Sequence, residues 1–199
     1  SVLARGVRKK KSKTAGLLLA FTSLKLSYID KNELKILTHV EIDKAACKLK
    51  GLSLYCGFYV NELVSYLLHK NDPHPEIFLE YQQCLLLLAE SDRTEQILRF
   101  FELNLVEHTG YGFQLITDAK TGESVQPLNK YYFTAEHGMT PCVTGYISGE
   151  TLVAINARQT LSKQALYEAK QLMRQVIDFQ LQGKELKSRA VLAQIIKKL

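Results

Sequence analysis

The sequence predicts an α+β protein, in which a small β domain over residues 1–45 precedes a helical domain over residues 46–199. Apolar residues alternate at every second position in the first part, which is typical of strands with one buried face. From residue 52 onward they recur at intervals of three and four, which is typical of helices packed on a core. A stretch rich in Gly, Thr and Tyr, residues 111–148, interrupts the helical part, and we interpret it as an irregular insert.

The β domain contains three predicted strands. Residues 2–7 form a short candidate strand that leads into a basic loop over residues 8–16. Residues 17–42 are predicted to form a β-hairpin, because apolar side chains alternate along both arms and Asp30 begins a polar turn sequence between them. Three strands alone make a poor domain. We therefore expect further strand upstream of Ser1.

Three helices are predicted over residues 52–110. Ser53 is a candidate N-cap for the first helix, and two prolines end it because proline removes a backbone donor. The second helix covers residues 75–90. Thr94 is a candidate cap for the third, which Gly110 ends. Since these helices are apolar over much of their circumference, we expect them to pack on each other.

Three more helices follow the insert, whose predicted strands lie around residues 131–133. A short helix is predicted over residues 150–157. Ser162 is a suitable N-cap for a long helix that Gly183 ends, and Ser188 is a candidate cap for the last helix. The last helix is expected to bury an apolar stripe made of Val191, Leu192, Ile195, Ile196 and Leu199.

The distribution of charge favours a polyanionic partner. The chain has 26 Lys and Arg against 20 Asp and Glu, a formal net charge of +6. Residues 1–13 contain six bases and no acid, and residues 183–199 contain five bases and one acid. The residues between them have a net charge of −4. An acidic body with two basic ends indicates a polyanion bound at particular surfaces rather than a uniformly basic protein.

Several functional classes are disfavoured by composition and spacing. The longest apolar runs have five and six residues, far fewer than the roughly 20 that span a bilayer. The four cysteines have no close pair, which favours a reducing, cytoplasmic setting. The histidines are dispersed, and neither clustered carboxylates nor a phosphate-binding glycine loop occurs. We therefore expect no cofactor, no metal, no membrane partner and no catalytic residues.

Two basic clusters are the candidate nucleic-acid contacts. Adjacent cations repel one another, and phosphates relieve that repulsion while they release counterions. Backbone N–H groups at a helix start also favour anions, which supports a phosphate role for the cations near the start of the last helix. A solvated, merely solubilising loop is the alternative for the first cluster. The clusters consist of Arg5, Arg8, Lys9, Lys10, Lys11 and Lys13, and of Lys184, Lys187 and Arg189.

Arg99 and the aromatic run at residues 131–133 each have two interpretations. Arg99 can form a salt bridge on its own helix, with Glu95 four residues before it or Glu102 three residues after it. It could instead be an exposed arginine beside an apolar groove, where its guanidinium would bind a partner's carboxylate. The aromatic run could stack on bases, although a strand with one buried face is the commoner explanation.

The order of several short segments carries a family resemblance. They are Ala4-Arg5-Gly6-Val7-Arg8, Leu54-Tyr55, Tyr59-Val60-Asn61-Glu62-Leu63, Leu98-Arg99-Phe100-Phe101-Glu102-Leu103, Gly110-Tyr111-Gly112 and Leu186-Lys187-Ser188-Arg189. In this order and spacing the chain resembles, nearly end to end, the RecO family of bacterial recombination mediators. The resemblance implies an N-terminal oligonucleotide-binding (OB) β-barrel, here without its first strands, followed by a helical domain.

The resemblance also implies a function in DNA repair and recombination. Members of the family bind single- and double-stranded DNA, anneal complementary strands, and work with RecR to load RecA onto DNA coated by single-strand-binding protein (SSB). It implies that Arg99, with Leu103 as a groove neighbour, helps to hold the acidic C-terminal tail of SSB. Some members carry a four-cysteine zinc site in the insert, but this insert contains only Cys142, so we predict no structural zinc.

We therefore predict a non-enzymatic mediator that acts in the bacterial cytoplasm, associated with the nucleoid. Two other functions stay open from the residues alone. One is a metal-dependent nucleic-acid-processing enzyme, which the lack of clustered carboxylates disfavours. The other is an RNA-binding or ribosome-associated factor, because two basic ends do not distinguish DNA from RNA.

Overall fold

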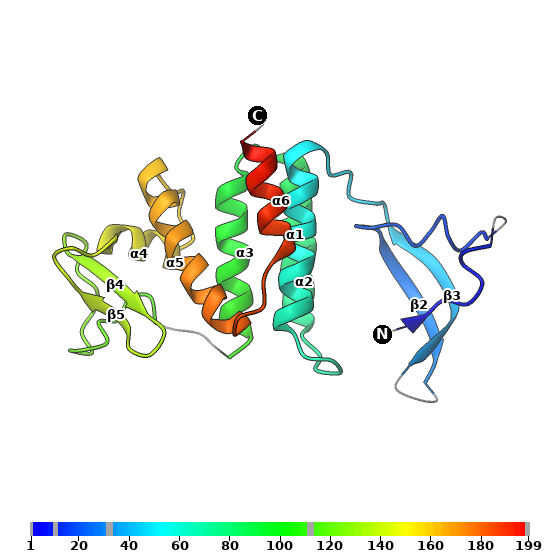
Figure 1. Cartoon of the computed structure of the whole chain (residues 1–199), viewed down its shortest axis with the longest axis horizontal. Coiled ribbons are helices and arrows are strands. Elements are labelled where there is room, and N and C mark those ends of the chain that lie inside the picture. Colours follow the sequence, from blue (N-terminus) through cyan, green and yellow to red (C-terminus); the bar gives the residue numbers. More distant parts are fainter. Residues whose placement is uncertain (1, 10–11, 31–33, 111–113, 198–199) are drawn as a thin grey trace. The chain divides into compact units, whose positions relative to one another are not determined.

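The computed structural model of the chain describes residues 2–9, 12–30, 34–110 and 114–197 (Figure 1). These residues form a mixed α+β structure with six helices and two small sheets. The chain divides into two compact units, Ser1–Leu49 and Lys50–Leu199. None of the helices in the described ranges combines the length and apolar character needed to cross a bilayer.

The first unit contains an open sheet of three strands, β1 (Val2–Leu3), β2 (Ser23–Ile29) and β3 (Lys35–Lys44), in the order β1-β3-β2. Strands β2 and β3 pair antiparallel, as predicted for the hairpin, with Leu26 opposite Val40. The buried face expected from the alternation is not found, since Leu26 and Tyr28 are 44% and 47% exposed. Strand β1 pairs parallel with β3 and ends well before residue 7, where the prediction placed its end, because Gly6 turns the chain with φ +72°. No closed barrel is formed by the described residues, so the expected OB barrel is not confirmed.

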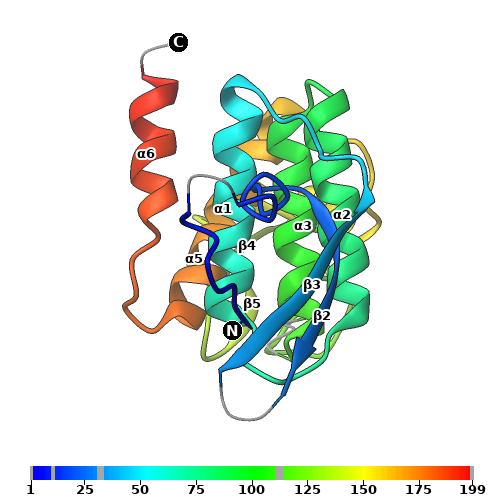
Figure 2. The same ribbon diagram turned by 90° about the vertical axis from the view of Figure 1, so that its right-hand side faces the viewer.

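The second unit is built on the helices α1 (Gly51–Leu67), α2 (Pro75–Glu90), α3 (Thr94–His108) and α5 (Lys163–Leu181), with α4 (Gly149–Asn156) and α6 (Lys187–Ile196) at its edges. Helix α3 packs against both α2 and α5, while α6 packs mainly on α1 (Figures 1 and 2). Most of the apolar residues at helical spacing face a common core, as predicted: Leu63, Leu105 and Leu172 are at most 1% exposed. Phe58 is an exception, at 45% exposure.

The insert carries a second sheet, with β4 (Lys130–Thr134) between β5 (Gly138–Pro141) and β6 (Ile147–Ser148). The predicted strand around residues 131–133 is confirmed. Tyr131 and Phe133 are buried while Tyr132 is exposed, so the aromatic run is a strand with one buried face. The base-stacking interpretation of this run therefore does not hold for the two buried rings.

The capping residues predicted from the sequence can be compared with the observed ends of the helices. Ser162 caps α5 by accepting the backbone N–H of Ala165, and Gly183 follows the helix with φ +85°, both as predicted. The other three predicted caps are wrong. Helix α1 starts at Gly51, before Ser53, and α3 and α6 already include Thr94 and Ser188. The residue directly before each of these three helices makes no capping hydrogen bond with its own side chain, so the residue type alone did not identify their start.

The predicted buried stripe of α6 is also wrong. Helix α6 has no buried residue, and Val191 and Ile196 are 43% and 52% exposed. The helix packs mainly against one neighbour, α1, so the rest of its circumference faces outward. Leu199 lies outside the described residues. The apolar residues of α6 thus belong to a partly exposed surface helix and not to the core.

Candidate nucleic-acid interface

The described residues of the N-terminal basic cluster lie on turns that follow β1. The backbone N–H of Lys9 donates to Gly6, and that of Ser12 donates to Lys9, which folds the segment into successive turns. Arg5, Arg8, Lys9 and Lys13 are all exposed. Lys10 and Lys11 lie outside the described residues. Because none of the four takes part in an ion pair within the part of the chain that the structure describes, their charges are open to external anions.

The C-terminal cluster separates into two kinds of residue. Lys184 and Lys187 are exposed, and the Lys184 ammonium lies 5.8 Å from the centre of the Tyr66 ring. Arg189 is only 23% exposed, because its guanidinium binds the carboxylate of Asp178 on α5. Two of the three predicted phosphate contacts, Lys184 and Lys187, are therefore open to solvent, and the third, Arg189, forms an ion pair inside the protein.

The start of α6 does not offer free backbone donors to a phosphate. The carboxylate of Glu62 on α1 accepts the N–H groups of Lys187 at 3.0 Å and Ser188 at 2.9 Å, together with the Ser188 hydroxyl at 2.5 Å. Desolvation raises the pKa of Glu62, but these hydrogen bonds and the nearby Lys187 outweigh it and lower the pKa. The site expected for an external anion is thus filled by a carboxylate of the protein itself.

Arg99 is buried, which contradicts the interpretation of an exposed arginine. Its Nη2 donates to Glu102 Oε1 at 2.5 Å, the i,i+3 salt bridge that the sequence also allowed. Tyr59 donates to the same Glu102 oxygen at 2.6 Å, and Glu95 pairs with Lys170 instead. Arg99 is 8% exposed and Glu102 is 1% exposed, so burial raises the pKa of the Glu102 carboxyl.

Leu103, the expected groove neighbour of Arg99, is also a core residue at 1% exposure. Two polar atoms of the buried pair, Arg99 Nε and Glu102 Oε2, have no hydrogen-bond partner among the described residues. Arg99 and Leu103 are therefore buried below the surface, where Arg99 neutralises the buried carboxylate of Glu102.

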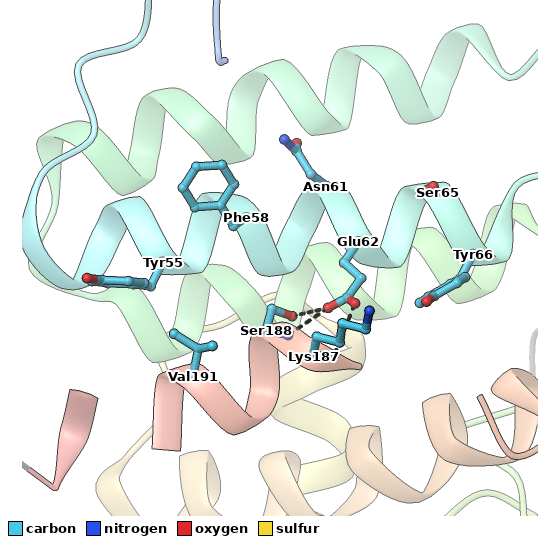
Figure 3. Close-up of a pocket in the computed structure, with 9 residues that line it drawn as sticks. All are labelled: Tyr55, Phe58, Asn61, Glu62, Ser65, Tyr66, Lys187, Ser188 and Val191. Atoms are coloured by element: carbon cyan, nitrogen blue, oxygen red, sulfur yellow. Dashed lines mark hydrogen bonds between the residues drawn. The ribbon is translucent and has the colours of Figure 1, made fainter. Parts of the chain in front are cut away.

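A groove that the sequence did not indicate lies between α1 and α6 (Figure 3). It has a volume of about 660 Å³. Tyr55, Phe58 and Tyr66 contribute aromatic rings from α1, and Lys187 and Val191 line it from α6. In the sequence, Tyr55, Phe58, Tyr59 and Leu63 follow one helical spacing that predicts a common buried face. Tyr59 and Leu63 are buried, but Phe58 is 45% exposed. The signal that could have located the groove is the spacing of Tyr55, Phe58 and Tyr66, which puts their rings on a side of α1 next to its core face.

Cys142, the one cysteine of the insert, is the residue that bears on the predicted lack of a zinc site. Cys142 has its Sγ 3.3 Å from Thr144 Oγ1. Among the described residues, no three His, Cys, Asp or Glu side chains gather where they would hold a metal ion. The lack of a structural zinc remains a prediction.

The chain is similar to known proteins over most of its length. Residues 50–190 match the family described as "Recombination protein O C terminal". The DNA repair protein RecO of Methylococcus capsulatus is 38% identical over 190 residues, which cover 94% of this chain and 78% of that protein. DNA repair protein RecO of Photobacterium profundum is 34% identical over 95% of this chain and 81% of its own length. The corresponding protein of Pseudoalteromonas atlantica is 36% identical, with 98% and 82% covered.

Proposed function

Because this chain belongs to the RecO family of DNA repair proteins, we propose that it binds single- and double-stranded DNA and anneals complementary strands. Family membership assigns the chain to DNA repair and recombination. The finer activity is our proposal, and the observation that supports it best is the set of exposed, unpaired cations that follows β1. We further propose that β1, β2 and β3 belong to an OB barrel.

The proposed mechanism is electrostatic and non-enzymatic. Two complementary strands repel each other through their phosphates, and cations on the protein reduce that repulsion while releasing counterions. Arg5, Arg8, Lys9 and Lys13 supply such charges on one unit, and Lys184 and Lys187 supply them on the other. We include Lys10 and Lys11 in the first set and Arg189 in the second, although Arg189 would act mainly by holding α6 in place.

We propose that the protein acts with RecR in the bacterial cytoplasm to load RecA onto DNA coated by SSB. For the acidic SSB tail, the family resemblance points to Arg99 and Leu103. Their burial means that a tail carboxylate would reach Arg99 only where local packing opens, and the Arg99 Nε–H would be its donor. Titration of an acidic tail peptide tests this role: Arg99→Ala should weaken binding, and equal affinity would leave Arg99 with the salt bridge alone.

Salt dependence of single-strand binding tests the electrostatic mechanism. The variant Lys9→Ala/Lys10→Ala/Lys11→Ala should flatten the slope of log affinity against log salt by about 2, at roughly 0.7 per lost contact. A matched control, Lys70→Ala/Lys120→Ala/Lys163→Ala, removes the same charge from exposed positions outside both clusters and should leave the slope nearly unchanged. Equal slopes for wild type and the first variant would eliminate the basic loop from DNA binding.

Two rival functions have direct tests. A metal-dependent nuclease or nucleotidyl transferase would cleave or extend labelled DNA when a divalent metal ion is added, and we expect neither reaction. An RNA-binding factor would bind an oligoribonucleotide more tightly than the DNA of the same sequence. We expect instead that the protein binds the DNA and anneals its complementary strands.

A further inference from the structure

We propose that the groove between α1 and α6 is a single-strand site, in which unpaired bases stack on Tyr55 and Tyr66 while the phosphates lie against lysines at the groove ends (Figure 3). This proposal rests on the proposed DNA-binding function and deepens it. It assigns to the helical unit a surface that recognises the faces of unpaired bases, in addition to the electrostatic contacts described above.

The aromatic rings of the groove are arranged along one side of α1. Tyr55 and Tyr66 lie eleven residues apart, which is a rise of about 16 Å along the helix. Tyr66 is 38% exposed, and Figure 3 shows the two rings at opposite ends of the groove. Every base has a π-face that can stack on a partly exposed aromatic ring.

The charges around the groove suit a polyanion. Lys187 lines it, and Lys184 lies over Tyr66 at the same end. Helices α1 and α6 run antiparallel here: the backbone N–H of Lys187, at the start of α6, donates to Glu62. Val191, farther along α6, lies toward Tyr55, near the start of α1 (Figure 3). Lys50 immediately before α1 and Lys197 immediately after α6 therefore flank the other end.

The one carboxylate that lines the groove does not oppose a polyanion strongly. The two carboxylate oxygens of Glu62 accept hydrogen bonds from the Ser188 hydroxyl and from the N–H groups of Lys187 and Ser188. Its charge is thereby shared among three donors, and Lys187 lies next to it. Aromatic rings between cations, with the single acid satisfied, form the combination typical of single-strand binding surfaces.

A single strand fits this combination better than a duplex does. Bases of a duplex are already stacked on one another, so their faces are closed to tyrosine. An acidic peptide with apolar side chains would share the charge preference, but it would not need the flat face of an aromatic ring. Single strand, duplex and acidic peptide should therefore respond differently to the loss of a tyrosine ring.

Fluorescence anisotropy with a labelled 20-nucleotide deoxythymidine strand tests the proposal on the whole chain. Tyr55→Ala and Tyr66→Ala should each weaken binding about tenfold, the typical effect of losing one stacked base. Tyr66→Phe keeps the ring and should bind like wild type. Tyr167→Ala is the matched control, since Tyr167 is an exposed tyrosine on α5, and it should change nothing. Binding of a 20-base-pair duplex should be the same for all variants.

Photo-cross-linking of the wild-type chain gives a readout that does not depend on the folding of a variant. A strand that carries 5-iododeoxyuridine should cross-link to Tyr55 or Tyr66, as identified by mass spectrometry. Adducts confined to residues 1–49 would overturn the groove proposal.

The remaining outcomes discriminate between the two proposals. If Lys9→Ala/Lys10→Ala/Lys11→Ala weakens single-strand binding while the tyrosine variants do not, the groove proposal fails and the DNA-binding function stands. If the wild-type chain binds no oligonucleotide, both fail. Equal losses for strand and duplex would contradict stacking. A loss of acidic-peptide binding with unchanged strand binding would make the groove a protein-docking site instead.

Discussion

Glu62 on α1 caps the first turn of α6, because its carboxylate accepts the backbone N–H of Ser188 at 2.9 Å. The two residues are 126 positions apart in the chain, so this is a tertiary cap. It satisfies N–H groups that a helix start otherwise leaves to water or to a ligand. The contact holds Lys187 beside the aromatic residues of α1, and it thereby connects the stability of α6 with the shape of the groove.

Removing the cap should loosen α6. Glu62→Ala takes away the acceptor for three donors and should destabilise the helix by about 0.5–2 kcal/mol, the usual cost of a lost N-cap. Hydrogen exchange followed by mass spectrometry should show faster exchange of the peptide that contains α6. Glu185→Ala removes an exposed carboxylate close to α6 and serves as the control. Identical protection in Glu62→Ala and wild type would show that α6 is held by packing alone.

The same cap should depend on pH. Hydrogen bonds from Ser188 and Lys187 outweigh desolvation and lower the pKa of Glu62 below the ordinary value of 4.5. A lowered pKa in the folded state means that Glu62 contributes stability above pH 4.5 and loses it as the pH falls through the folded-state pKa.

Urea unfolding at several pH values measures this effect. Wild type should be more stable than Glu62→Gln at pH 7, and the difference should shrink as the pH falls below 4.5. A constant difference across this range would rule out the charge of Glu62 as the origin of the stabilisation.

Breaking the buried ion pair of α3 should be costly. Arg99→Met leaves the Glu102 carboxylate buried with only Tyr59 as a hydrogen-bond donor, and loss of one partner of a buried pair typically costs about 3–5 kcal/mol. Arg99→Met/Glu102→Gln should recover much of this loss, because a neutral amide still accepts the Tyr59 hydroxyl. Lys170→Met, which breaks the exposed pair with Glu95, should cost at most about 1 kcal/mol.

Chemical denaturation of these three variants decides the point. If the double variant were no more stable than Arg99→Met, the cost would come from the lost packing of the arginine side chain and not from an uncompensated charge.

Gly149 should not tolerate a side chain. A Cβ at this position would lie 2.0 Å from the backbone oxygen of Gln126, where neither backbone can move without disturbing the insert. Gly149→Ala should therefore destabilise the protein by about 1–3 kcal/mol, as overpacking does. Thermal unfolding should show a fall in Tm of at least about 2 °C. Gly16→Ala is the control, since the nearest atom to its Cβ would be 3.9 Å away, and an equal fall in Tm there would contradict the steric explanation.

The sequence predicted best where the signal is local. Alternation along two neighbouring segments and the polar turn between them predicted a hairpin, and β2 and β3 do pair antiparallel. Ser162 caps α5 because its own hydroxyl reaches the N–H of Ala165 three residues on. Prediction failed where the partner is remote. The pattern of α6 indicated a buried stripe, yet whether such a stripe is covered depends on how many neighbours pack on the helix.

The two alternatives for Arg99 show the same limit. The sequence offered Glu95, Glu102 or a partner's carboxylate, and spacing could not choose among them. The structure pairs Arg99 with Glu102, which also accepts from Tyr59, 43 residues away on α1. Glu102 is thus buried between donors from two helices, and its partner Arg99 is buried with it.

By itself, the sequence determined the α+β class, the helical body, the strand in the insert and the basic character of both ends, because each follows from periodicity or composition over a few consecutive residues. Only the tertiary structure decided which cations remain open, which one is paired with Asp178, and that Glu62 fills the helix start where a phosphate was expected. These properties depend on side chains that chain folding brings together from distant positions, and no local pattern encodes that proximity.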